Sequence, residues 1–293
     1  MILSPNLKGA LLMMGSMAAF TFNDACIKLV AGDLPLFQIV FLRGVLTTVF
    51  IGVLAYAFGL RSLAIPREDW GRVAGRTVAE IASMVAFLVA LTHMPLANVT
   101  SILAALPLTI TLAGALFLGE PVGWKRLAAI LVGFSGVLLI VKPGGEGFNV
   151  YSLVAVLAVM LVTARDLFTR RFSDGVPSLA VAVITAGSVG LFGGLLMLWQ
   201  GWETVSAGQA GLVAGAAVFI VGGYLFSIMV MRVGEIGFVA PFRYTALVWA
   251  LLLGWFVFGD WPRPLTLIGA AIVVSTGIFT LYRERKLREV GDG

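Results

Sequence analysis

The chain has 293 residues, of which 60% are hydrophobic and only 12% are charged, and its formal net charge is +5. This composition excludes an ordinary soluble domain, in which about a quarter of the residues are charged. The single cysteine excludes an internal disulfide, and the single histidine, without an HExxH or GxSxG motif, argues against a hydrolytic membrane enzyme. We therefore predict a membrane protein that is not an enzyme and that uses no cofactor, metal or nucleic-acid partner.

Ten long apolar segments follow one another along the chain. About 20 apolar residues are needed for one helix to cross a bilayer. The candidate spans are 7–29, 36–58, 72–91, 96–118, 124–141, 150–172, 178–199, 209–231, 237–258 and 264–282. The connections between them are short, so no soluble domain fits, and we predict an all-α membrane protein with ten transmembrane helices.

The chain repeats itself once. The pattern Asp24, Lys28, Pro35 returns 142 positions later as Asp166, Arg170, Pro177. Near the end of each copy, Leu118-Gly119-Glu120-Pro121 returns as Phe258-Gly259-Asp260-Trp261-Pro262. Each copy holds five spans, and an odd number places the copies in opposite orientations. We predict two inverted five-helix repeats, 7–142 and 150–283, around a central cavity, followed by a basic tail at 284–293.

Basic residues indicate the orientation of these spans. Arginines crowd the stretch 61–76 and the tail, whereas the side opposite to them holds Lys28, Lys142 and Arg263. The positive-inside rule then places both termini in the cytoplasm. The stretch 200–215, which corresponds to the arginine-rich 59–76, contains no arginine. Homologous loops with opposite charge are expected of inverted halves.

Small residues and prolines interrupt or pack the spans. Pairs such as Gly190 and Gly194 favour close helix packing within one bundle, with a homodimer as the alternative. Pro107 lies eleven residues into the fourth span, where it frees a backbone carbonyl near Leu103. A kink that faces a central cavity and a purely packing role are both open for Pro107.

Several of these features together resemble the drug/metabolite transporter superfamily, EamA type. They are the five-plus-five arrangement of spans, the Gly119-Glu120 turn with its Gly259-Asp260 counterpart, and Gly136 and Gly277 in the closing helix of each copy. The resemblance covers 7–283. It implies a basket of helices around a central cavity, with the closing helix pair of each half outside it. It also implies gradient-driven transport of a small organic solute across a bacterial inner membrane, without ATP hydrolysis.

A shorter stretch resembles a bacterial subset of that family. Residues 240–246 read Ala-Pro-Phe-Arg-Tyr-Thr-Ala and are followed by Trp249. The subset includes riboflavin importers, S-adenosylmethionine transporters and amino-acid exporters. Riboflavin uptake by alternating access is our first specific choice, with transport or efflux of an amino acid or S-adenosylmethionine as the alternative. A passive channel is the rival class, because inverted repeats also build channels.

Charged residues within the spans are the main functional candidates, because burial in a membrane is costly for them. We expect an outer closure between Asp24 and Arg43, with Lys28 one turn beyond Asp24. We also expect an inner closure that joins Asp166 or Glu80 to Arg165 or Arg243. The structural alternative is that these ion pairs only hold the helix bundle together.

Some of the same residues are also candidates for substrate binding. Glu80 can serve as the carrier of a coupling proton, although a simple pair with Arg76 is equally open. The aromatic rings of Tyr244 and Trp249 can stack a flat substrate ring. The substrate-binding set that we predict is Glu80, Arg165, Asp166, Arg243, Tyr244 and Trp249.

Overall fold

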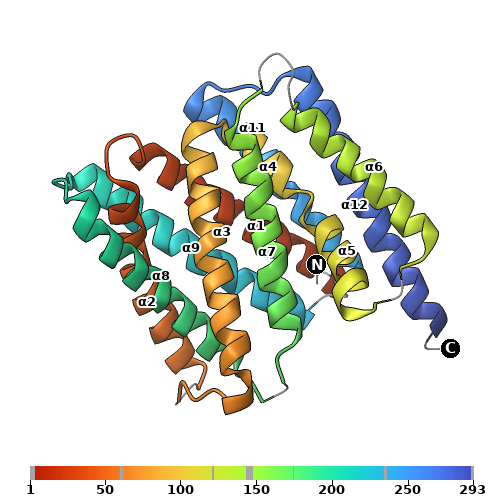
Figure 1. Ribbon diagram of the computed structural model, residues 1–293, viewed down its shortest axis with the longest axis horizontal. Helices are drawn as coiled ribbons and strands as arrows, with labels where there is room; N and C mark the ends of the chain where they lie inside the picture. Colours follow the sequence, from red (N-terminus) through yellow and green to blue (C-terminus); the bar gives the residue numbers. More distant parts are fainter. Residues whose placement is uncertain are drawn as a thin grey trace.

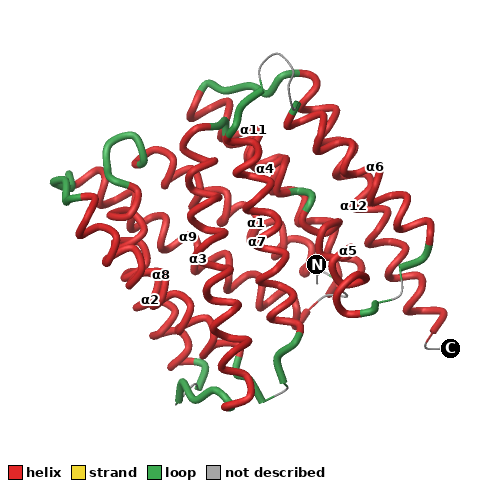
Figure 2. The backbone as a smooth tube through the Cα atoms, viewed as in Figure 1, coloured by secondary structure: helices red, strands yellow, loops and turns green. Residues whose placement is uncertain are grey.

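The computed structural model describes residues 4–59, 62–120, 122–142, 148–173, 175–233 and 236–291, without the side chains at 228, 231, 232, 236, 237 and 284–291. Pro121 of the first Gly-acid turn and the side chains of the predicted basic tail lie outside the described residues. All regular structure in the described ranges is helical (Figure 2).

Ten helical segments of the described chain are long and apolar enough to cross a membrane, as predicted. The first five comprise α1 (Pro5–Val30), α2 (Leu36–Ala57), α3 (Trp70–His93) after the short η1 (Arg67–Asp69), α4 (Leu96–Leu103) with α5 (Leu106–Leu118), and α6 (Trp124–Val141). The other five comprise α7 (Tyr151–Arg170), α8 (Ser178–Gln200), α9 (Ala207–Val233), η2 (Ala240–Tyr244) with α11 (Thr245–Phe258), and α12 (Pro264–Gly291). The short α10 (Ile236–Val239) precedes η2.

Helices from the two halves pack against each other in a regular order. The main pairs are α1 with α9, α2 with α8, α3 with α7, and α6 with α12. Matching the spans of the two halves in order makes α1 correspond to α7, and α3 to α9. Exchanging the halves then turns the α1·α9 pair into the α3·α7 pair, and it leaves the α2·α8 and α6·α12 pairs unchanged. Figure 1 shows α6 and α12 side by side at one edge of the bundle, and α2 with α8 at the other.

Glycines allow the closest of these crossings. A Cβ atom on Gly44 of α2 would lie only 2.5 Å from the Cα of Gly190 in α8. A Cβ atom on Gly136 of α6 would lie 2.7 Å from the carbonyl oxygen of Gly269 in α12. Packing, rather than hydrophobicity, drives helix association in lipid, so these contacts hold the halves together. They account for Gly190 and Gly136 within a single chain.

The helix surface that faces outward is apolar. Trp124 begins α6 and is 75% exposed, whereas Trp199 lies at the end of α8 and is 89% exposed. Leu198 and Phe256 are exposed to a similar degree. Large exposed apolar side chains around the outside of a helical bundle, with tryptophans near the helix ends, match the apolar core and the headgroup level of a bilayer.

Candidate functional site

A cavity of about 240 Å³, here called the main cavity, lies between α1, α7 and the two broken spans. In each half, the first span and the fourth span contribute to its wall. α1 and α7 provide polar and charged side chains, and the α4–α5 junction and the η2–α11 junction provide the rest of the lining. The same two elements of each half therefore meet at one place.

Charges of both signs line the main cavity. The charged residues among its lining are Asp24 of α1, Arg165 and Asp166 of α7, and Arg243 of η2. Asp24 and Asp166 are the two aspartates at corresponding positions of the repeat, and the fold brings both to the same space. A cavity with two carboxylates and two guanidinium groups is able to bind the positive and the negative end of one solute.

Both fourth spans are interrupted where they reach the cavity. α4 ends at Leu103 and α5 begins at Leu106, with Pro107 in its first turn. Pro107 and Leu103 both line the cavity, so the break between α4 and α5 lies at its wall. The corresponding stretch of the second half is the 3₁₀ helix η2, which carries Arg243 and Tyr244. Broken helices at membrane depth are tolerated where they line a cavity, and in transporters they form substrate sites.

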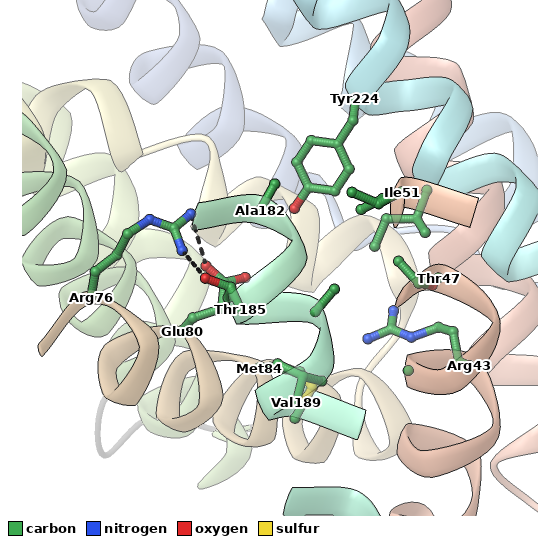
Figure 3. A pocket seen from close by; sticks show the side chains of 13 residues that line it. Arg43, Thr47, Ile51, Arg76, Glu80, Met84, Ala182, Thr185, Val189 and Tyr224 are labelled. Atoms are coloured by element: carbon green, nitrogen blue, oxygen red, sulfur yellow. Dashed lines mark hydrogen bonds and ion pairs between the residues drawn. The ribbon is translucent and has the colours of Figure 1, made fainter. Parts of the chain in front are cut away.

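A second cavity of about 100 Å³, here called the Glu80 cavity, lies between α2, α3, α8 and α9 (Figure 3). Its wall is built from the second and third spans of each half. Arg43, Arg76, Glu80 and Tyr224 are the titratable residues in its lining. Arg76 Nη1 donates to Thr185 Oγ1 at 2.8 Å, and Arg76 Nη2 lies 3.8 Å from Glu80 Oε2.

Arg165 joins the two cavities. Its Nη1 donates to Glu80 Oε2 at 3.1 Å, and its Nε donates to Asp166 Oδ1 at 2.8 Å. Glu80 lines one cavity and Asp166 the other, so a single planar guanidinium bridges them. Both carboxylates that we considered for the inner closure therefore contact Arg165, whereas Arg243 makes no ion pair with any described carboxylate.

Asp24 and Arg43 are joined through a third residue. Asn23 Nδ2 donates to Asp24 Oδ1 at 2.9 Å, and Arg43 Nη1 donates to Asn23 Oδ1 at 3.3 Å. Asn23 is buried, with 3% exposure, and sequence reasoning missed it because a neutral amide does not stand out among apolar residues. Lys28 points elsewhere and donates to the carbonyl oxygens of Leu91 and Met94 at 2.7 and 2.5 Å.

The two aromatic candidates occupy different surroundings. Tyr244 lines the main cavity, but its hydroxyl group packs against Gly277 of α12 and has no hydrogen-bond partner among the described residues. Trp249 is not among the cavity-lining residues, and its ring lies 6.4 Å from that of Phe22. The structure therefore brings Asp24, Arg165, Asp166, Arg243, Tyr244 and Pro107 together, and places Trp249 in the packing between helices.

Comparison with known proteins decides the family. The profile of the EamA-like transporter family matches residues 7–142 and 149–282. The chain belongs to this family. With ten apolar helices in the described part of the chain and bacterial transporter relatives, this EamA-family protein is a multi-pass protein of a bacterial inner membrane.

Several curated relatives of this EamA-family protein are named as transporters. It is 25% identical to an S-adenosylmethionine uptake transporter of Rickettsia conorii, with 92% of this chain and 91% of the relative covered. It is 27% identical to a pseudopaline exporter of Pseudomonas aeruginosa, with coverage of 94% and 96%. It is 29% identical to a riboflavin transporter of Vibrio cholerae, with coverage of 67% and 66%. A solved crystal structure shares the fold, with a TM-score of 0.68 at 20% identity over 95% of this chain and 98% of the other.

Proposed function

We propose that this EamA-family protein is a secondary carrier that moves a small zwitterionic metabolite, with an amino-acid-like end, across the inner membrane by alternating access. One observation carries the proposal: Asp24, Asp166, Arg165 and Arg243 line the same cavity. A zwitterion satisfies such a cavity, because its ammonium group pairs with a carboxylate and its carboxylate pairs with a guanidinium. Arg165 and Asp166 are already paired with each other, but Asp24 and Arg243 have no described ion pair, so a purely apolar solute leaves these two charges unpaired beside it.

Alternating access is supported by the relation between the halves. The repeat pattern of the sequence and the exchange of α1·α9 with α3·α7 both favour two equivalent halves. The odd number of spans in each half and the distribution of basic residues favour opposite orientations, with both termini in the cytoplasm. A carrier built this way exposes one site to either side by rocking equivalent halves against each other.

The residues that line the main cavity change the order in which we rank the candidate substrates. Riboflavin is a neutral flat-ring compound, and the sequence favoured it through the resemblance to a bacterial subset of the family and through spans rich in aromatic residues. Trp249 lies in the helix packing, whereas four charged side chains line the cavity. S-adenosylmethionine carries an α-amino-acid group together with a sulfonium cation, and relatives named as S-adenosylmethionine uptake transporters cover nine-tenths of this chain. We therefore place S-adenosylmethionine and amino acids ahead of riboflavin.

The experiment is counterflow into proteoliposomes that contain the purified protein. Vesicles are preloaded in parallel with unlabelled S-adenosylmethionine, a neutral amino-acid mixture or riboflavin, and the matching labelled compound is added outside. We expect saturable accumulation with S-adenosylmethionine or an amino acid, which requires preloading and is absent from empty vesicles. Accumulation with riboflavin alone would overturn the zwitterion proposal, and a flux that does not saturate and does not need preloading would indicate a channel.

A further inference from the structure

The two Gly-acid turns that end α5 and α11 have the same backbone construction. Gly119 and Gly259 both adopt the left-handed conformation, with φ of 69° and 67°, which costs glycine little. The N–H of Glu120 donates to the carbonyl of Gly114 at 3.2 Å, and the N–H of Asp260 donates to the carbonyl of Gly254 at 2.8 Å. Each turn therefore presents one carboxylate at a corresponding position at the end of the fourth span of its half.

The carboxylate of the first turn reaches across to the other half of the protein. Arg170 Nη1 lies 2.5 Å from Glu120 Oε1. Gly114 leaves the space for this contact, because a Cβ atom there would collide with the Glu120 carboxylate and lie 3.3 Å from Arg170 Nη1. Ending a helix requires only the glycine, so the ion pair between halves is an additional feature of this turn.

The corresponding basic residue of the first half is Lys28. Lys28 and Arg170 each follow the repeated aspartate by four positions. Lys28 Nζ lies 5.6 Å from the ring centroid of Phe258, two residues before Asp260, and the Asp260 carboxylate is within electrostatic range of it. The ammonium is instead held by the carbonyl oxygens of Leu91 and Met94, and no described contact within 4 Å joins it to Asp260. One of two equivalent pairs is thus formed in this structure, and the other is not.

We infer that Glu120–Arg170 and Asp260–Lys28 are equivalent latches that close alternately at the two ends of the transporter. The inference rests on the proposed alternating-access function and assigns four gating residues to it. In this structure the Glu120–Arg170 latch is closed and the Asp260–Lys28 latch is open. The side chains of Arg170 and Glu120 are 41% and 43% exposed, and exposed ion pairs are weak. Such a pair biases a conformational equilibrium and still opens in every cycle.

Closing of the second latch can be measured by cross-linking. Cys26 is the only cysteine of the chain, so Cys26→Ser gives a cysteine-free background. In that background Lys28→Cys and Asp260→Cys are combined, and the rate of cross-linking by a short bifunctional thiol reagent is measured in proteoliposomes. The same rate is then measured after adding Glu120→Gln. The matched control is Glu68→Gln, which removes an exposed carboxylate outside either latch.

We expect Glu120→Gln to raise the Lys28–Asp260 cross-linking rate about threefold, as the weak free energy of an exposed ion pair allows, because it releases the closed latch and shifts the population towards the opposite state. Glu68→Gln should leave the rate unchanged. A rate that Glu120→Gln does not change, in protein that elutes as a single peak from gel filtration, would overturn the inference.

A charge exchange gives a second, independent readout. Glu120→Arg or Arg170→Glu alone should raise the same cross-linking rate, and the two together should restore the parent rate. Loss of restoration in the double variant would contradict a direct latch. Neither readout needs a known substrate, so the alternating-latch inference and the zwitterion proposal can fail separately. Even if the parent protein transports none of the tested compounds, the cross-linking rates still test the latches.

Discussion

The two cavities are built alike but charged differently. The main cavity takes the first and fourth spans of each half, and both halves contribute an aspartate to it, Asp24 and Asp166. The Glu80 cavity takes the second and third spans of each half, but its charged side chains all come from the first half. The residue 142 positions after Arg43 is Thr185, which is neutral. Charge from both halves marks the cavity that we expect to serve both sides of the membrane.

A finer difference separates the two aspartates of the main cavity. Asp166 is neutralised directly by Arg165, whose Nη2 lies 2.7 Å from its carboxylate. Asp24 receives a hydrogen bond from the neutral amide of Asn23, with Arg43 one step further away. Among the described residues, Asp24 therefore has no directly bound cation, whereas Asp166 does. If the proposed zwitterionic substrate binds in this cavity, we expect its ammonium or sulfonium group to pair with Asp24.

Asp24→Asn should have the largest effect on transport. The substitution preserves shape and removes the charge, and a hydrogen bond to a charged group is worth roughly 1.5–3 kcal/mol. Since about 1.4 kcal/mol is tenfold, we expect uptake at low substrate concentration to fall about 100-fold, near the upper end of this range. The measurement is initial counterflow rate, normalised to protein in the vesicles.

Asp166→Asn is the matched control for this prediction. The two aspartates hold corresponding positions, and Asp166 already has an ionic partner, so we expect a loss of only about tenfold, at the lower end of the same range. Equal losses in the two variants would remove the distinction between the aspartates. Full activity of Asp24→Asn would remove Asp24 from the substrate site.

Arg165→Gln tests the link between the cavities. The substitution leaves Glu80 and Asp166 without their shared guanidinium, and breaking such pairs is destabilising. Because these side chains are partly exposed to the cavities, we expect a stability loss of about 2 kcal/mol rather than the larger cost of full burial. Thermal unfolding in detergent should reveal this loss, with transport reduced about tenfold.

Arg165→Lys provides the companion variant. Lysine keeps the charge but cannot reproduce the planar fork that contacts two carboxylates. It should recover most of the stability and only part of the transport. Complete recovery of both would show that charge alone, without the bridge between cavities, accounts for Arg165.

Thr185→Val tests the Glu80 cavity on its neutral side. Valine has nearly the same volume and removes the hydroxyl group that accepts a hydrogen bond from Arg76 at 2.8 Å. One such bond is worth about 1 kcal/mol, so we expect transport to fall by about fivefold at most. A loss as deep as that of Asp24→Asn would instead place substrate in this cavity. Thr185→Ser, which keeps the hydroxyl group, should behave as the parent.

The helices were predictable from sequence because their signal is local. Each span needs about 20 apolar residues, and the boundaries agree with the helices to within a few positions for most spans. The interruption before Pro107 was predictable for the same reason, since proline cannot supply the backbone donor that a continuous helix requires. The glycines that end α5 and α11 also act locally, through their left-handed backbone.

The pairing of charged side chains was not predictable in the same way. Arg165 contacts Glu80 across 85 positions of sequence, and this choice depends on how α3 packs against α7. The membrane depth predicted from position along each span placed Asp24 at the level of Arg43, but it did not reveal the buried amide of Asn23 between them. Predicted depth also did not show that Lys28 donates to backbone carbonyl oxygens or that the ring of Trp249 packs near that of Phe22. Contacts of this kind depend on helix rotation, which periodicity in an almost uniformly apolar span does not report.

Among the four main predictions for transport, Tyr244→Phe should have the smallest effect. The Tyr244 ring lines the main cavity, but its hydroxyl group is buried against Gly277 and has no described hydrogen-bond partner. Removing a hydroxyl that makes no hydrogen bond relieves the cost of burying it, so stability should be unchanged or slightly higher. Transport should change less than about twofold, well under the tenfold that 1.4 kcal/mol represents. A large loss would mean that the hydroxyl group turns into the main cavity during transport, and Tyr244 would then join Asp24 as a residue that binds the substrate directly.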